Sequence, residues 1–148
     1  MSGARVVALH ISLARGAAMT SRQQVQALAD YGLADDAHAR PGGSRQVLLI
    51  DAETLEEFSL APGAVMENIT TLGLDLGALT AGSRLRVGEA LLEVTKPCTP
   101  CGRMDEIRPG LQENLRGRRG LLARVLTAGA VRVGDAIEVL GPAASPPG

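Results

Sequence analysis

Short apolar segments separated by glycine turns restrict the fold of this chain more than any other sequence feature. Residues 4–13 carry apolar side chains at period two, which predicts a strand. We expect the inner face of this strand to carry Val7, Leu9, Ile11 and Leu13. His10 lies on the outer face, and we expect it to have a structural role. A doubly wound α/β fold requires a helix between successive strands, and the spacing does not supply those helices. The pattern therefore indicates a mainly β (α+β) domain, a barrel or sandwich with a few short helices.

Two stretches of similar sequence, residues 81–94 and 128–139, support this interpretation. Each contains a strand-like segment, a turn made of glycine and an acidic residue, and a second strand-like segment. The turns are Gly88-Glu89 and Gly134-Asp135. The copies are too short to be solenoid repeats, so we predict two similar hairpins in one closed sheet.

Periodicity and turn residues predict the remaining segments. Residues 21–30 fit either a short helix or a strand, and residues 31–44 form a long polar loop of the kind that often carries function. Further predictions are a strand at 45–50, a helix after Asp51 with Thr54 and Glu57 at capping-box spacing, a helical segment at 103–116 broken at Pro109-Gly110, and a strand at 121–126. We assign residues 1–140 to one domain and residues 141–148 to a flexible Pro/Ala/Gly-rich tail.

Composition disfavours several classes of function. The chain has 148 residues, of which 45% are apolar and 21% charged, as expected for one globular domain. Tyr31 and Phe58 are its only aromatic residues, which disfavours a nucleic-acid reader that stacks bases. A net charge of −1 argues against binding to nucleic-acid phosphates or to a membrane surface. No apolar run approaches the roughly 20 residues that span a bilayer, and we find no signal peptide, so we expect a cytoplasmic protein.

One short segment combines the only lysine of the chain with both cysteines. Fourteen of the fifteen basic residues are arginine, a bias typical of GC-rich coding sequence, so Lys96 stands out. It begins the segment Lys-Pro-Cys-Thr-Pro-Cys-Gly at 96–102, directly after a predicted strand. This segment is the first candidate for chemistry.

Four interpretations of the cysteines are open. Cys98 and Cys101 give four zinc ligands together with His10 and His38, although the spacing fits no zinc-finger pattern. Cys-x-x-Cys also occurs in thiol-disulfide centres, but the βαβ context of those centres is missing. A single soft thiolate near Lys96 and arginines can bind a metal or carry sulfur. The fourth interpretation is two small residues buried in a turn.

A set of ordered motifs extends over most of the chain. The motifs are Gly32-Leu33-Ala34-Asp35-Asp36-Ala37-His38, Arg45-Gln46-Val47, Pro62-Gly63 followed by Glu67-Asn68-Ile69-Thr70-Thr71, Gly82 with Leu85-Arg86-Val87-Gly88, Pro100-Cys101, and Gly134-Asp135. In this order they resemble the MOSC family, which comprises the C-terminal domain of molybdenum-cofactor sulfurases and small stand-alone bacterial proteins.

The resemblance implies a partly open β-barrel with a cysteine in a cleft, and a protein that binds the molybdenum cofactor (molybdopterin) or transfers its sulfur. One alternative is a molybdenum-dependent reductase of N-hydroxylated compounds that needs an external electron donor. Another is a thiol-disulfide protein that uses Cys98 and Cys101, and enzymatic activity stays open at this point. The expected partners are the cofactor or a persulfide-donating, pyridoxal-phosphate-dependent desulfurase, with no nucleic acid and no membrane. Exposed strand edges are compatible with a homodimer.

The resemblance and the chemistry of the residues together select the candidate site. Cys101 is the candidate catalytic residue, as molybdenum ligand or persulfide carrier, because a soft thiolate suits both roles. His38 is the second catalytic candidate, as an acid or base. Arg45 and Lys96 can receive the pterin phosphate, whereas the arginines at 116–119 are predicted to lie in a solvated turn. The candidate cofactor-binding residues are Asp36, Arg45, Asn68, Thr71, Lys96 and Cys98.

Overall fold

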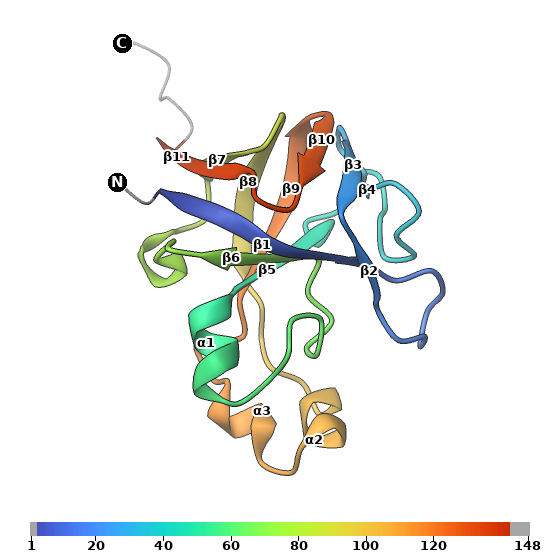
Figure 1. Cartoon of the computed structure of the whole chain (residues 1–148), viewed down its shortest axis with the longest axis vertical. Helices are drawn as coiled ribbons and strands as arrows, with labels where there is room; N and C mark the ends of the chain where they lie inside the picture. Colours follow the sequence, from blue (N-terminus) through green and yellow to red (C-terminus); the bar gives the residue numbers. More distant parts are fainter. Residues whose placement is uncertain (1–2, 143–148) are drawn as a thin grey trace.

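The computed structural model describes residues 3–142 and consists mainly of short strands (Figure 1). The strands are β1 (Ala4–Ile11), β2 (Thr20–Arg22), β3 (Gln24–Leu28), β4 (Gly32–Leu33), β5 (Val47–Asp51), β6 (Ile69–Leu72), β7 (Ser83–Val87), β8 (Ala90–Pro97), β9 (Leu121–Thr127), β10 (Gly129–Arg132) and β11 (Ala136–Pro142). The helices are α1 (Ala52–Glu57), the 3-10 turn η1 (Leu76–Ala78), α2 (Arg103–Ile107) and α3 (Leu111–Asn114).

Seven of these strands close into a barrel in the order β11-β7-β8-β9-β5-β6-β1. Short β1–β11 pairing completes the ring through Ala4 opposite Ile137 and Arg5 opposite Ala136. Only β5 and β6 are parallel among the barrel neighbours, and α1 lies in the connection between them. The prediction of a mainly β barrel with a few short helices is therefore confirmed.

Aliphatic side chains form two main cores, as a chain with so few aromatic residues requires. The larger core fills the barrel with leucine, valine, isoleucine and alanine side chains. A smaller core lies beneath α1, α2 and α3, which gather at one end of the barrel (Figure 1). It consists of Ile50, Leu55, Val65, Met104, Leu111 and Leu115. The broken helix predicted at 103–116 is confirmed as α2 and α3.

Strand β1 differs from its predicted facing. The pairing of β1 with β6 shifts register between Val6 and Ala8. This bulge brings Val6 into the same core as Leu9 and Ile11. The prediction of Val7 and Leu13 on the inner face is wrong, because Val7 is only half-buried and Leu13 is 58% exposed beyond the end of the strand.

The two similar sequence stretches adopt different pairings. The first is a hairpin, because β7 pairs with β8 in antiparallel fashion. The second is not: β10 pairs with β3 in a separate three-stranded sheet, whereas β11 pairs with β7 and β1. At the turn, Gly134 N–H donates to Val6 O at 2.8 Å and Val6 N–H donates to Asp135 O at 2.9 Å. These bonds attach the turn to β1, so the chain passes from one sheet to the other.

Two local predictions are resolved by the structure. Residues 21–30 form strands β2 and β3 with alternating burial, so the strand alternative applies. Helix α1 begins after Asp51 as predicted, but the capping box is wrong. Asp51 Oδ2 accepts from Thr54 N–H at 3.1 Å and from its hydroxyl at 2.8 Å, while Glu57 pairs with Arg118.

The C-terminal boundary differs slightly from the predicted one. Strand β11 continues through Pro142, so the first two residues of the predicted tail belong to a strand, and residues 143–148 lie outside the described residues. Within residues 3–142, no helix is long and apolar enough to cross a membrane.

Candidate functional site

Cys98 and Cys101 are both free thiols, but they lie in different environments. Cys98 follows the end of β8, and its backbone N–H donates to Gly120 O at 2.9 Å. Its side chain is 8% exposed and packs with Leu48 and Leu122. Cys101 is exposed and lines neither of the cavities described below. Of the two cysteines, Cys98 is therefore the one that borders these cavities, and the functional role expected for Cys101 stays a prediction.

Cys98 borders a cavity of about 540 Å³ that we call the basic cavity. Polar groups enter it from the loop before β5, from the segment before β6 and from the turn before β9. Its charged or polar lining residues are Arg15, His38, Arg40, Ser44, Arg45, Gln46, Asn68 and Arg119. None of the described residues that line it is acidic. The cavity therefore suits an anionic ligand.

Arg119 is the most unusual residue of the basic cavity. It is only 5% exposed, and its Nη2 donates to Val65 O at 2.6 Å. Its Nε and Nη1 atoms are buried without a hydrogen-bond partner within residues 3–142. Buried guanidinium groups are normally paired, because leaving an N–H group dry and unpaired is costly. The prediction of a solvated turn is thus wrong for Arg119.

Gly120 explains why the turn before β9 adopts this conformation. Its φ is +105°, and a Cβ atom at this position would lie 2.2 Å from Leu49 O. Only glycine permits that close approach of two backbone segments. Because Gly120 O also accepts the Cys98 N–H bond, the same turn positions the thiol and the Arg119 guanidinium.

The structure brings four of the predicted residues to the basic cavity: His38, Arg45, Asn68 and Cys98. His38 and Arg45 are exposed at its surface. Asn68 is buried and acts as a clamp between strands, since its Oδ1 accepts from Leu48 N–H at 2.9 Å and its Nδ2 donates to His10 O at 3.2 Å.

Asp36 lies behind the cavity lining rather than in it. Its Oδ1 accepts from Ser12 N–H at 2.8 Å, and its Oδ2 accepts from Asn68 Nδ2 at 3.4 Å. Burial raises the pKa of Asp36, while the Ser12 N–H, the charge of His38 and the Asn68 amide oppose that rise. Asp36 therefore positions Asn68 and the loop that carries His38.

Thr71 and Lys96 do not reach the basic cavity. Thr71 is fully buried in β6, and its hydroxyl has no hydrogen-bond partner in the described part of the chain. Lys96 is exposed on β8. Neither residue lines the cavity, so the structure does not bring them together with the other candidates.

Gln46 is a structural residue of the site that the sequence-based selection omitted, although it belongs to the Arg-Gln-Val motif. Its Oε1 accepts from Val125 N–H at 3.0 Å, and its Nε2 donates to Arg40 O at 3.1 Å. It thereby joins β9 to the loop that supplies Arg40. Nothing in the local sequence distinguishes Arg119 from Arg118, so no sequence signal could have selected Arg119.

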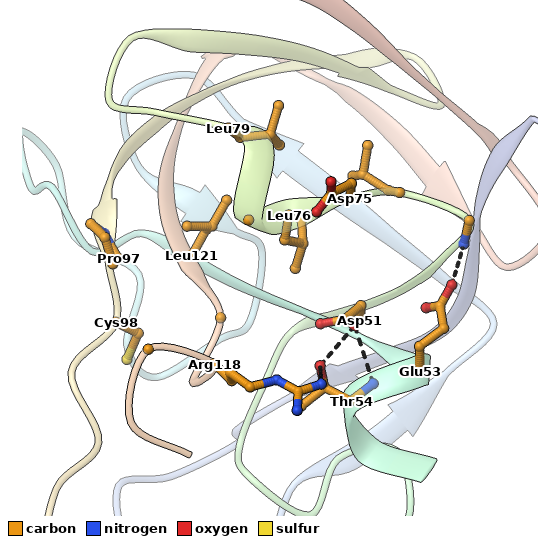
Figure 2. Close-up of a pocket in the computed structure, with 15 residues that line it drawn as sticks. Asp51, Glu53, Thr54, Asp75, Leu76, Leu79, Pro97, Cys98, Arg118 and Leu121 are labelled. Atoms are coloured by element: carbon orange, nitrogen blue, oxygen red, sulfur yellow. Dashed lines mark hydrogen bonds between the residues drawn. The ribbon is translucent and has the colours of Figure 1, made fainter. Parts of the chain in front are cut away.

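A second cavity, which we call the acidic cavity, also borders Cys98 (Figure 2). Its volume is about 620 Å³, and Asp51, Glu53 and Asp75 contribute its carboxylates. Arg118 also lines it, but its Nη1 forms an ion pair with Glu57 Oε2 at 2.6 Å. The thiol thus separates two cavities of opposite charge.

The zinc interpretation of the cysteines finds no support in the structure. Across residues 3–142, no group of three or more His, Cys, Asp or Glu side chains is arranged to hold a metal ion. Any metal at Cys98 would therefore need further ligands from outside these side chains.

Comparison with known proteins agrees with this architecture. A family model described as the MOSC domain matches residues 36–138. YuaD from Bacillus subtilis has 23% sequence identity and a TM-score of 0.79, over 93% of this chain and 96% of that one. YiiM from Geobacillus stearothermophilus has 20% identity and a TM-score of 0.75, over 93% and 75%. YiiM from Escherichia coli has 22% identity and a TM-score of 0.70, over 95% and 72%. No match was found among curated proteins.

The fold and the site define a small β-barrel protein with a buried thiol beside a cationic cavity. The match to the family model covers more than half of the chain, and the chain belongs to the MOSC domain family. The solved structures, at these low identities, show the shared fold.

Proposed function

We propose that this MOSC protein binds the molybdenum cofactor in the basic cavity, with Cys98 as the metal ligand. The observation that carries the proposal is that a buried thiol and Arg119 border the same cavity. The Nε and Nη1 atoms of Arg119 have no hydrogen-bond partner within residues 3–142. A soft sulfur ligand suits molybdenum, and a guanidinium suits the phosphate of the pterin.

The residues present fit the cofactor in charge and size. Arg40, Arg45 and Arg119 supply positive charge, and no described lining residue opposes it with a carboxylate. A volume of about 540 Å³ lies in the range of small-molecule sites, which is roughly 300–1,000 Å³. When bound, the metal would supply redox chemistry to a compound beside the thiol.

The chain's own residues have distinct tasks in this proposal. Cys98 holds the metal through its sulfur, and Leu48 and Leu122 shield that sulfur from water. Arg119 holds the phosphate, and its bond to Val65 O keeps the guanidinium in place. His38, exposed at the cavity surface, can give or take a proton at its imidazole.

Molybdenum content tests the proposal. Wild type, Cys98→Ser and Cys101→Ser are purified from a host that makes the cofactor, and metal is measured per chain. We expect about one molybdenum per chain in wild type and in Cys101→Ser, and almost none in Cys98→Ser, because one thiolate supplies the protein ligand. Full retention in Cys98→Ser, or loss only in Cys101→Ser, would contradict it.

A sulfur-carrying role uses the same thiol and gives a different result. A desulfurase persulfide would transfer its outer sulfur to the Cys98 thiolate, which leaves a persulfide on Cys98 and a thiolate on the donor. Protein without metal but with a trapped persulfide on Cys98 would favour this role. In this role the protein would act in the cytoplasm and receive its sulfur from a desulfurase partner. Turnover of an N-hydroxylated compound by metal-loaded protein and a reduced dye would instead identify a reductase.

A further inference from the structure

A groove next to the basic cavity contains a buried histidine that the proposed function does not use. We call it the His10 groove, and its volume is about 460 Å³. Its walls come from β1, from the segments around residues 16–19 and 61–66, and from α2. The lining residues used below are His10, Met19, Ala61, Met66, Arg103 and Ile107.

His10 has an unsatisfied polar atom. The residue is 8% exposed, and its Nδ1 is buried without a hydrogen-bond partner in the described part of the chain. Its ring cannot move toward the neighbouring loop, because it packs against Gly63: a Cβ atom there would lie 2.7 Å from His10 Cδ2 and Nε2. A buried imidazole nitrogen normally has a partner. Because the His10 ring forms part of the groove wall, a ligand bound in the groove would change the environment of this ring.

The other walls define the chemistry of such a ligand. Met19, Met66 and Ile107 present thioether and aliphatic surface, which makes favourable contacts with aromatic rings. Arg103 adds a positive charge, and no described lining residue is acidic. An aromatic ring with an anionic edge therefore fits the groove better than a cation.

Met66 connects this groove to the basic cavity. It lines both, and its φ is +66°, a left-handed conformation that is unusual for a residue other than glycine. Its N–H donates to Gly63 O at 3.0 Å, and the carbonyl of the preceding Val65 accepts from Arg119 Nη2. Such strained positions are frequent at ligand sites.

We infer that the His10 groove is a second ligand subsite, which takes an aromatic ring bearing an anionic group beside the basic cavity. Its role rests on the proposed function, since the subsite would hold the organic part of a compound that reacts near Cys98. Its binding does not depend on that function, because none of the groove residues ligates the cofactor in the proposal.

Proton NMR with cofactor-free protein tests the inference. The chain has two histidines, so the His38→Gln variant identifies the His10 Cε1–H signal. The probes are indole-3-acetate, an anion, and tryptamine, a cation with the same ring. We expect indole-3-acetate to shift the His10 signal to saturation and tryptamine to bind about fivefold more weakly, the size of an exposed charge interaction. Equal affinities would overturn the charge preference and with it the inference.

Two variants and their controls locate the binding. Ala61→Leu fills the groove and should abolish the shift, whereas Ala128→Leu, also at an exposed alanine, should leave it unchanged. Arg103→Gln should remove the preference for indole-3-acetate, and Arg86→Gln on β7 should keep it. Unchanged binding in both Ala61→Leu and Arg103→Gln would overturn the inference. Because no metal is present, this result is independent of the molybdenum measurement.

Discussion

The two cavities that border Cys98 have opposite charge, although their arginines are adjacent in the sequence. Arg118 lines the acidic cavity (Figure 2). Its Nη1 is paired with Glu57 Oε2 at 2.6 Å. Arg119 lines the basic cavity and has two buried nitrogen atoms without partners within residues 3–142. Of this pair, Arg119 is the arginine that has no acidic partner in the described part of the chain. In the proposed function, an arginine without an acidic partner, more than an arginine that is merely nearby, would therefore determine on which side of the thiol an anion binds.

The largest expected effect comes from the turn that separates the two arginines from β9. Gly120→Ala should lower the free energy of unfolding by about 3 kcal/mol or more, because its Cβ would collide with Leu49 O. Gly117→Ala is the matched control, since its φ is +76° but a Cβ there meets nothing within 4 Å. It should cost only about 1 kcal/mol. Urea unfolding measures both, and equal losses would refute the role of the close approach at Gly120.

The next largest loss of stability is expected at Asn68, in the wall of the basic cavity. Asn68→Ala removes the side-chain partner of the Leu48 N–H and of the His10 C=O, which should cost about 2–3 kcal/mol in the free energy of unfolding. Thr71→Val, on β6 directly after Asn68, removes a hydroxyl that has no partner in the described part of the chain, so it should change stability by less than about 1 kcal/mol. A Thr71→Val loss as large as that of Asn68→Ala would contradict the assignment of Asn68 as the clamp.

The contrast between the arginines can be tested with inorganic phosphate. Arg119→Met should weaken phosphate binding about tenfold, because it removes charge-assisted hydrogen bonds. Arg118→Met should leave phosphate binding unchanged and lower stability only slightly, through lost contacts with Glu57 and the Phe58 ring. NMR titration gives the affinities. Weaker binding in Arg118→Met alone would assign the anion to the acidic cavity.

Asp36 provides the smallest effect, visible as a pH dependence. Burial raises the pKa of Asp36 above 3.8 in the folded chain, so its carboxyl ionises less readily there than in the unfolded chain. The stability of wild type relative to Asp36→Asn should therefore be highest below pH 3.8 and fall as pH rises through the raised pKa. Urea unfolding of both proteins over a pH series measures this difference. A difference that stays constant, or that increases with pH, would show that desolvation does not dominate at Asp36.

Local sequence patterns predicted much of the fold, and non-local contacts explain the errors. The alternation at 21–30 and the break at Pro109-Gly110 depend on neighbouring residues only, so they could be interpreted from the sequence. The partner of β10 could not, because hydrogen bonds between Gly134 or Asp135 and Val6 attach the turn to a strand more than 100 residues away.

The candidate site shows the same division. Motif resemblance selected His38, Arg45 and Asn68, and the structure brings them to the basic cavity together with Cys98, which was chosen from its place in the cysteine segment. It favoured Cys101, preceded by Pro100, because that cysteine lies where the family has its characteristic cysteine; the structure adds that Cys98 is buried and Cys101 exposed. The burial of Cys98 involves a non-local contact, because its N–H donates to Gly120 O in the turn before β9.

The central claim, that the Cys98 thiol serves the basic cavity, can be tested most directly by the charge preference of its alkylation. Rates with anionic iodoacetate and neutral iodoacetamide are measured by mass spectrometry at Cys98 and, as an internal reference, at exposed Cys101. We predict a higher iodoacetate-to-iodoacetamide ratio at Cys98 than at Cys101, and a decrease of the Cys98 ratio in Arg119→Met but not in Arg118→Met. A Cys98 ratio equal to or below that of Cys101 would contradict the claim, because the thiol would then be approached without help from the basic cavity.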